Sequence, residues 1–279
     1  MKREALKRIP LRANPFQGFG ERAHRILFAA FLLQFLLVWL NLWTGFPNFA
    51  AARWPEGLLL VLCAASNIAG LVRYLPGQNV MLASLIVALV SGIAHTLSAT
   101  IAIPFGPCVY TERLGQMLFY PLPWAMPVIW LVAIFSSRGV ARLVMRPWRK
   151  THSYGFWVMG LTVLLVLLFD LGLEPFATHV KHYWIWNRTN AGLFWYRAPW
   201  VNFLGWAATA LVILAFATPS LINKKSTRQP ADFYPLVIWL MVNALFVTGA
   251  LVQGLWAAAL VEVTGAIAAG IIAVRGGMW

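Results

Sequence analysis

Long apolar stretches dominate this chain, and polar residues are confined to the segments between them. About 20 apolar residues form a helix long enough to cross about 30 Å of lipid hydrocarbon. Stretches of about that length occupy residues 25–44, 57–74, 79–102, 125–145, 154–174, 201–218, 234–252 and 254–273. The last two are separated only by Gln253 and Gly254. The pattern therefore predicts an all-α, polytopic transmembrane bundle of seven to eight spans.

Two connections differ from the short polar loops of the rest of the chain. Residues 103–124 (IPFGPCVYTERLGQMLFYPLPW) and 175–200 (PFATHVKHYWIWNRTNAGLFWYRAPW) are long, aromatic and rich in Pro and Gly. Irregular backbone is tolerated at membrane depth only where it is buried in protein or lines a cavity. We therefore expect both loops to fold back over the bundle. Because no repeat or second domain is visible, residues 1–279 are expected to form a single integral membrane domain.

Composition and charge support a membrane protein and suggest its orientation. The chain is 61% hydrophobic and 11% charged, which excludes an ordinary soluble domain. With the N-terminus inside, seventeen of the Lys and Arg residues fall on the inner side and five on the outer side. This asymmetry predicts a multi-pass protein of the cell (cytoplasmic) membrane, with residues 1–24 as a basic cytoplasmic tail. The net charge of +14 is spread over many loops, so we predict no nucleic-acid partner.

Neither a removable leader nor a metal site is predicted. The N-terminus lacks a short apolar core followed by a small-residue cleavage site. Cys63 and Cys108 have no CxxC spacing, so a disulfide framework or a thiolate metal site is not expected. His179 and His182 have no third ligand at a suitable spacing, and a lone His95 favours a hydrogen bond to a neighbouring helix. We expect no cofactor.

Acidic residues are scarce, and two of the eight stand four positions apart at the end of the fifth span. Asp170 and Glu174 share one helical face, and Glu112 lies in the other long loop. Ionisable groups at membrane depth are candidates for function, and an acid that keeps its proton in an apolar pocket can act as a general acid. We expect these three carboxyl groups to converge on one cavity near the outer face.

Structural roles compete with this interpretation. Asp170 and Glu174 could instead form ion pairs with Lys181, Arg113 or Arg188 that hold the loops in place. Glu262 stands in AALVEVTGAIAAG, where small residues indicate close helix packing, so a buried structural hydrogen bond is expected there.

Aromatic residues are denser near the two acids than an interfacial belt requires, and they predict a slot for a long apolar ligand. Their ring faces would also stabilise a carbocation, by about 0.5–2 kcal/mol per well-placed ring. The residues of this group are Trp184, Trp186, Trp195, Tyr196, Trp200 and Trp206.

The same segments resemble those of a known family. IPFGPCVYTERLG (103–115) with PLPWAMPVIW (121–130), then DLGLEPFA (170–177), and then WIWN (184–187) with WYRAPWVNFLGW (195–206) are similar, in order, to the motifs of the CruF-type carotenoid hydratases. The three blocks, 103–130, 170–177 and 184–206, cover about 60 residues of the chain.

The resemblance implies a cofactor-independent hydro-lyase of carotenoid biosynthesis. Such an enzyme adds water across the terminal double bond of an acyclic end group, as in lycopene or γ-carotene, through protonation and capture of a tertiary cation. Asp170 would be the acid and Glu174 would orient the water, with Glu112 completing the catalytic group. Carotenoid, membrane lipid and other enzymes of the pathway would be the partners. The expected substrate-binding residues are Tyr110, Trp124, Trp184, Trp186, Tyr196, Asn202 and Trp206.

Two other functions stay open at this point. A carotenoid cyclase or isomerase also begins by protonating an alkene, but its product contains no added oxygen. A non-catalytic carotenoid- or lipid-binding membrane protein would leave the mass of its ligand unchanged and would tolerate loss of both acids.

Overall fold

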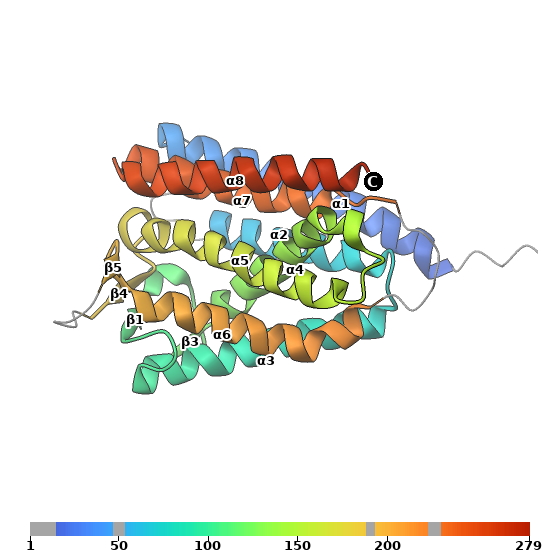
Figure 1. The fold of residues 1–279 in the computed structure, drawn as a ribbon. Helices are drawn as coiled ribbons and strands as arrows, with labels where there is room; N and C mark the ends of the chain where they lie inside the picture. The colour runs from blue at the N-terminus through green and yellow to red at the C-terminus, as the bar shows by residue number, and fades with distance from the viewer. Residues whose placement is uncertain (1–14, 47–53, 188–192, 223–229) are drawn as a thin grey trace, which may run out of the picture.

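The computed structural model describes residues 15–46, 54–187, 193–222 and 230–279 (Figure 1). Most of the basic tail predicted at 1–24, most of the loop 223–233, and Arg188 lie outside the described residues. Within them, eight helices are long and apolar enough to cross a membrane. They are α1 (Pro15–Thr44), α2 (Trp54–Val72), α3 (Gly77–Ile101), α4 (Ala125–Val144), α5 (Tyr154–Pro175), α6 (Trp200–Ala217), α7 (Tyr234–Val252) and α8 (Trp256–Gly277).

These helices confirm the predicted all-α bundle and decide for eight spans rather than seven. The uncertain boundary, between α7 and α8, is a tight turn in which Gly254 has a φ of +68°. Glycine adopts such a left-handed conformation readily, so the three residues 253–255 are enough to separate two helices that otherwise read as one apolar stretch.

α4 is the centre of the bundle, and its neighbours are α2, α3, α5, α7 and α8. In the apolar stretch of α4, 72% of the residues are buried inside the protein, whereas in that of α1 the share is 22%. Small residues such as Ala133, Ser136 and Ala141 are fully buried along α4. Small side chains let neighbouring helices approach closely, which is the usual basis of packing between membrane helices.

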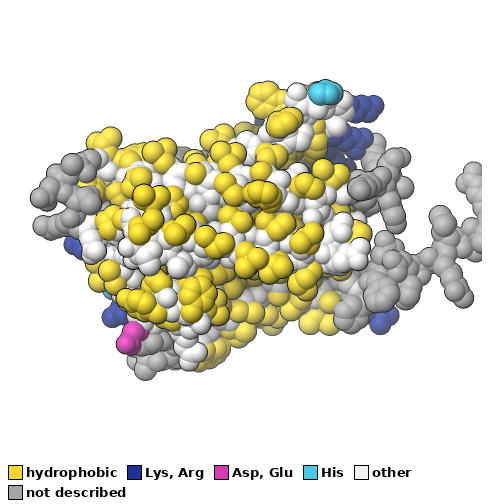
Figure 2. Space-filling view, turned by 90° about the horizontal axis from the view of Figure 1, so that it is seen from below, with side chains coloured by type: hydrophobic (Ala, Val, Ile, Leu, Met, Phe, Trp, Pro, Cys, Tyr) yellow, Lys and Arg dark blue, Asp and Glu magenta, His cyan; other side chains and the backbone are white. Residues whose placement is uncertain are grey.

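The surface of the bundle is a broad hydrophobic band, and Lys and Arg side chains gather toward the ends of the molecule (Figure 2). α1 begins and α8 ends at one end, and the β-strands lie at the other (Figure 1). Together with the eight apolar helices, this arrangement identifies a multi-pass membrane protein. The orientation relative to the cytoplasm stays a prediction.

The two long loops fold back over the strand end of the bundle, as expected. β1 (Cys108–Tyr110) in the first loop pairs antiparallel with β4 (Trp184–Trp186) in the second, with Tyr110 opposite Trp184. Each loop also forms its own small hairpin, β2 (Met117–Phe119) with β3 (Leu122–Pro123) and β5 (Phe194–Trp195) with β6 (Ala198–Pro199). Short 3₁₀ turns occupy Glu112–Leu114, Arg146–Trp148 and Thr218–Leu221.

The end of α5 explains how the second loop is positioned. Pro175 has no backbone N–H, so it cannot bond the carbonyl of Leu171 one turn earlier. The indole Nε1 of Trp195 donates to that carbonyl instead, at 2.9 Å. The chain then widens into a π-turn at Phe176–Val180, closed by a bond from Lys181 N to Phe176 O at 2.9 Å. This turn directs the following strand, β4, back across the end of α5.

Candidate active site

Asp170 and Glu174 form the centre of a buried polar cluster at the strand end. They project from one face of α5 and are 0% and 1% exposed. Asn202, near the start of α6 and 1% exposed, joins them. Its Nδ2 donates to Asp170 Oδ2 at 2.9 Å and to Glu174 Oε1 at 3.0 Å. One amide group therefore links both acids and fixes their side chains relative to each other.

Two indoles complete the coordination of Glu174. Trp184 and Trp186 are alternate residues of β4, so their side chains point to the same side of the strand. Their Nε1 atoms donate to Glu174 Oε2 at 3.2 and 2.9 Å. Glu174 thus accepts three N–H bonds, all from neutral groups. Asp170 accepts one, and its Oδ1 has no hydrogen-bond partner among the described residues. We call these five residues the acid–aromatic cluster.

The alternative of ion pairs that hold the loops in place is not seen for Lys181. Lys181 is paired with Glu56, at the start of α2, rather than with Asp170 or Glu174. Among the described residues, each hydrogen bond to the two acids comes from an amide or an indole. The charge of a carboxylate in this cluster is therefore stabilised by dipoles and not neutralised by a cation.

A second polar chain faces the same space and contains His95, on α3. Trp130 Nε1 donates to His95 Nε2 at 2.7 Å, so the hydrogen of the neutral ring lies on Nδ1. Nδ1 then donates to the hydroxyl of Tyr110 at 2.7 Å. The expectation that His95 bonds a neighbouring helix is confirmed, since Trp130 lies on α4.

The polar groups of β1 stay neutral. Burial, followed by the influence of Cys108 and Glu174, raises the pKa of Tyr110 well above its usual range. Burial, followed by the charge of Glu174, raises the pKa of Cys108 to about 12, against an opposing hydrogen bond with Tyr110. Tyr110 is therefore a neutral hydroxyl donor at physiological pH, and Cys108 is a thiol rather than a thiolate nucleophile.

Stacked aromatic rings wall the site from the bundle core. Trp206 stacks on Trp130 with ring centroids 4.1 Å apart and an interplanar angle of 16°. Phe105 stacks on His95 at 4.4 Å and 24°. Phe105 reaches α6 because Gly205 has no side chain: an added β-carbon there would lie 2.7 Å from both Phe105 Cδ1 and Pro104 O.

A small cavity of about 10 Å³ lies between the two polar chains. That is about the room one water molecule occupies, and it is too small for a terminal isoprenoid unit. The aromatic slot predicted from the sequence is thus closed in this structure, and side chains have to move before an alkene can enter. Asp170 does not line the cavity. The lining residues are His95, Phe105, Cys108, Tyr110, Met126, Glu174, Trp184, Trp186, Asn202 and Trp206.

Three predicted site residues lie elsewhere. Glu112 is exposed in the 3₁₀ turn after β1, so the structure does not bring the three carboxyl groups together. Trp124 packs on Gly115 and not on the cavity. Tyr196 lies near the start of α8, where its hydroxyl accepts from Ala258 N at 3.3 Å. Loop backbone, which has no fixed period, decides where such side chains point.

Other groups were not predicted for the site or behave differently from expectation. Trp130, Phe105, Cys108 and Met126 line or support the cavity without a sequence signal that separates them from ordinary core residues.

Glu262 is 1% exposed and lies against Gly172 of α5, but its carboxyl oxygens make no hydrogen bond among the described residues. The structural hydrogen bond expected for Glu262 is therefore absent there. The described residues contain no group of three or more His, Cys, Asp or Glu side chains able to hold a metal ion.

Comparison with known proteins places this architecture in a family. The profile of the carotenoid biosynthesis protein family matches residues 56–271, which include α2 to α7, both long loops and most of α8. A bisanhydrobacterioruberin hydratase from Haloarcula japonica is 27% identical over 109 residues, which cover 39% of this chain. The matched part spans 34% of that relative's length. No solved structure matches the chain.

Proposed function

This chain belongs to the family of carotenoid biosynthesis proteins, and on that premise we propose that it hydrates the terminal double bond of an acyclic carotenoid end group. The substrate class is lycopene, γ-carotene or a longer relative, which reaches the site from the lipid. The observation that carries the proposal is the position of Glu174, a buried carboxyl at the wall of a water-sized cavity, linked through Asn202 to a second buried carboxyl. Similarity to a protein named as a hydratase supports the same reaction.

Two buried carboxyl groups bridged by one amide cannot both be charged, since two full charges in so little solvent would repel strongly, so the pair begins the reaction protonated and loses one proton in the first step. Glu174 lines the cavity and Asp170 does not, which favours Glu174 as the group that meets the alkene. This division of roles differs from the sequence expectation, in which Asp170 was the acid. Asp170 then acts from behind, through Asn202: with one donor and an Oδ1 that has no partner among the described residues, it keeps its proton, so the single negative charge that forms is held on Glu174.

In the first step, the Glu174 carboxyl hydrogen adds to the alkene carbon that bears one hydrogen. The π electrons form the new C–H bond, and positive charge develops on the carbon that bears two methyl groups. The resulting Glu174 carboxylate is stabilised by the N–H groups of Trp184, Trp186 and Asn202, which are already in place. The ring faces of the site stabilise the tertiary cation.

In the second step, a water molecule attacks the tertiary cation. Its oxygen forms the C–O bond, and one of its hydrogens returns to the Glu174 carboxylate, which restores the starting state. The neutral Tyr110 hydroxyl is placed to orient that water, since it faces the cavity. The net change is one alkene plus one water giving one tertiary alcohol, with no redox cofactor.

We further propose that the N-terminus faces the cytoplasm, because the basic residues gather at that end.

The test is the mass of the pigments in a lycopene-producing host that expresses the full chain. We expect a product heavier by one water, and Glu174→Gln should lower its yield by about 10²–10⁴-fold, the usual contribution of a general acid. Asp170→Asn should cause a loss of similar order. Both variants keep a buried hydrogen-bonding side chain of the same shape, so they should still accumulate in the membrane.

Glu262→Gln is the matched control, because it removes a carboxyl that is equally buried in the bundle but outside the cluster. It should keep the wild-type yield of alcohol. A cyclic product without added oxygen would show that the chain cyclises the end group rather than hydrating it. An unchanged yield of alcohol in Glu174→Gln would refute the assignment of the acid, and unchanged pigment in every strain would refute enzymatic activity on this substrate.

A further inference from the structure

A second and much larger cavity lies at the opposite end of the bundle from the acid–aromatic cluster. It has a volume of about 550 Å³, within the range of small-molecule sites. Its walls come from α1, α2, α4 and α7, with the segment just before α7. We call it the basic pocket, and it goes beyond the proposed hydratase function, since no step of that reaction uses it.

Cations of α4 and the turn that follows it form one side of the basic pocket. Arg138 and Arg142 are four residues apart and lie on one face of α4, and Arg146, Arg149 and Lys150, in and after the following 3₁₀ turn, continue the row; we call these five residues the arginine stripe. Arg138 is 7% exposed, and its Nη2 donates to Leu221 O at 3.0 Å. Like charges at this spacing repel, and a buried guanidinium is costly without an anion. The stripe is therefore suited to an anionic ligand.

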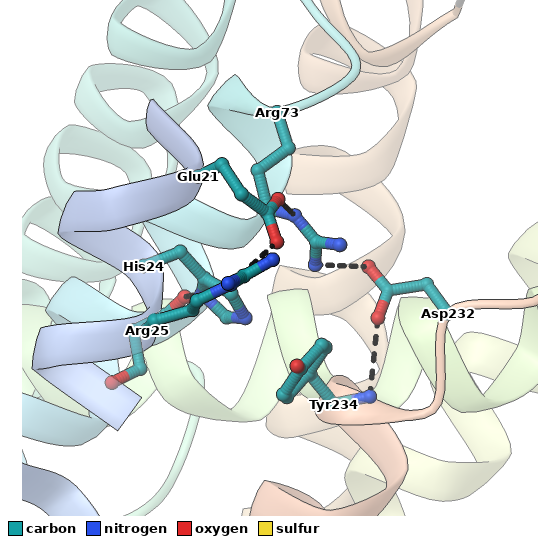
Figure 3. A network of polar contacts seen from close by, with 7 residues as sticks. Glu21, His24, Arg25, Arg73, Asp232 and Tyr234 are labelled. Atoms are coloured by element: carbon teal, nitrogen blue, oxygen red, sulfur yellow. Dashed lines mark hydrogen bonds and ion pairs between the residues drawn. The ribbon is translucent and has the colours of Figure 1, made fainter. Parts of the chain in front are cut away.

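The carboxylates of this end are already engaged by other cations. Figure 3 shows Arg73 between Glu21 and Asp232, with Nε 2.6 Å from Glu21 Oε2 and Nη1 3.6 Å from Asp232 Oδ2. Glu21 also pairs with Arg25 at 3.1 Å. In the part of the chain that is described, neither Arg138 nor Arg142 forms an ion pair with a carboxylate. Asp232 also lines the pocket but is paired with Arg73, so among the described lining residues the cations outnumber the carboxylates.

The floor of the pocket carries buried polar atoms that lack a partner among the described residues. His24 and Ser66 are both 0% exposed. His24 Nδ1 donates to the carbonyl of Ser66 at 3.1 Å, so the neutral ring presents Nε2 as an acceptor. His24 Nε2 and Ser66 Oγ have no hydrogen-bond partner. A ligand that fits this floor brings hydroxyl groups as well as charge.

We propose that the basic pocket binds a glycerol phosphate group, with the phosphate against the arginine stripe and a hydroxyl group against His24 and Ser66. Arginine recognises phosphate through charge-assisted, often bidentate hydrogen bonds. The group could be supplied by two sources: the headgroup of a membrane lipid, or a soluble phosphate ester. The chemistry at the pocket is the same for both, and the experiment separates them.

The experiment measures binding to the full chain, purified in a neutral detergent, by native mass spectrometry. Phosphatidylglycerol and glycerol 3-phosphate are the two probes, and phosphatidylcholine is the lipid for comparison. The pocket variant is Arg142→Gln with Arg149→Gln, because both side chains are exposed at the rim and their loss should not disturb folding. The control variant is Arg22→Gln with Arg275→Gln, which removes the same charge from exposed positions that do not line the pocket.

We expect the wild-type chain to prefer phosphatidylglycerol to phosphatidylcholine, and the pocket variant, which lacks two cations, to bind it about thirtyfold more weakly, from roughly 1 kcal/mol for each cation lost. The control variant should bind as the wild type does. Displacement of the lipid by millimolar glycerol 3-phosphate would identify a soluble ester as a competent ligand, and failure of displacement would identify the lipid headgroup. Equal binding by the pocket and control variants would overturn the proposal, because binding would then follow surface charge alone. This assay does not measure pigment hydration, so a failure of the binding proposal would leave the proposed reaction unaffected.

Discussion

The two ends of the bundle bury polar groups in opposite ways. In the acid–aromatic cluster, Asp170 and Glu174 receive hydrogen bonds from the neutral groups of Asn202, Trp184 and Trp186. At the other end, Glu21 and Asp232 are paired with Arg73. A cation beside a carboxylate stabilises its charged form, whereas neutral donors leave it able to exchange a proton without breaking an ion pair.

The two arrangements suit different roles: the acid–aromatic cluster suits proton transfer, and the opposite end suits the binding of charge. An acid that must give up and regain a proton in each turnover is better held by fixed dipoles than by a salt bridge. Ion pairs at the other end join α1, α2 and the start of α7 and leave the arginine stripe of α4 exposed to a ligand. Substitutions at three places in the molecule test this comparison.

The largest effect is expected at the residue that links the two acids. Asn202→Leu removes both amide bonds and leaves two buried carboxyl oxygens without donors, which costs about 1–3 kcal/mol for each group. The yield of hydrated carotenoid should fall by at least about 100-fold, as expected when the geometry of a general acid is lost. Pigment analysis and the unfolding temperature in detergent measure the two effects.

Asn243→Leu provides the matched control. Asn243 is also fully buried, but the one bond that its Nδ2 donates among the described residues stays within its own helix, to Trp239 O at 2.6 Å. Its substitution should therefore leave the product yield unchanged and alter stability little. Equal losses of product yield in the two variants would mean that any buried amide affects the yield. The role assigned to the acid–aromatic cluster would then be refuted.

A smaller effect is expected for the indole donors. Trp186→Phe keeps an aromatic ring but removes the N–H that bonds Glu174 at 2.9 Å, and the yield should fall about tenfold, the scale of one hydrogen bond to a charged group. Trp184→Phe should lose less, because its bond is longer, at 3.2 Å. Trp239 is as buried, yet its Nε1 has no partner among the described residues, so Trp239→Phe should have no effect on yield. If the three variants retained equal activity, these N–H groups would have no role in the reaction.

The smallest effect on the product is expected at the basic end. Arg73→Met breaks the pairs with Glu21 and Asp232, and the free energy of unfolding should fall by about 1 kcal/mol, as for ion pairs that water partly reaches. Because such pairs are screened, the loss should shrink at high salt. The yield of alcohol per folded protein should stay within about twofold of the wild type. A larger loss of yield would show that the two ends are coupled.

The helices could be predicted from the sequence to within about four residues at their ends, except that α1 begins at Pro15 rather than at residue 25. Each span is a local property, since apolar length alone decides whether a segment crosses the bilayer. The pairing of Asp170 with Glu174 on one face was also local, because four residues make about one helical turn. The fold-back of both long loops followed from the same reasoning about backbone at membrane depth.

Loop residues could not be placed in this way. Glu112 and Tyr110 are two positions apart, but Tyr110 faces the cavity and Glu112 faces outward. Tyr196 was assigned to the slot because it stands among tryptophans, and the backbone carries it to α8 instead. Trp130 could not be predicted as a site residue, because its bond to His95 joins two residues that are 35 positions apart on different helices.

The sequence by itself determined a membrane protein of seven to eight helices with two acids at the end of its fifth span, because hydrophobic length and helical period act over a few neighbouring residues. Only the tertiary structure decided that Asn202 links those acids, that Glu174 rather than Asp170 meets the cavity, and that the arginines of α4 face a separate pocket. Those relations depend on the rotation and approach of helices that are far apart in the chain, and packing sets them once for the whole bundle.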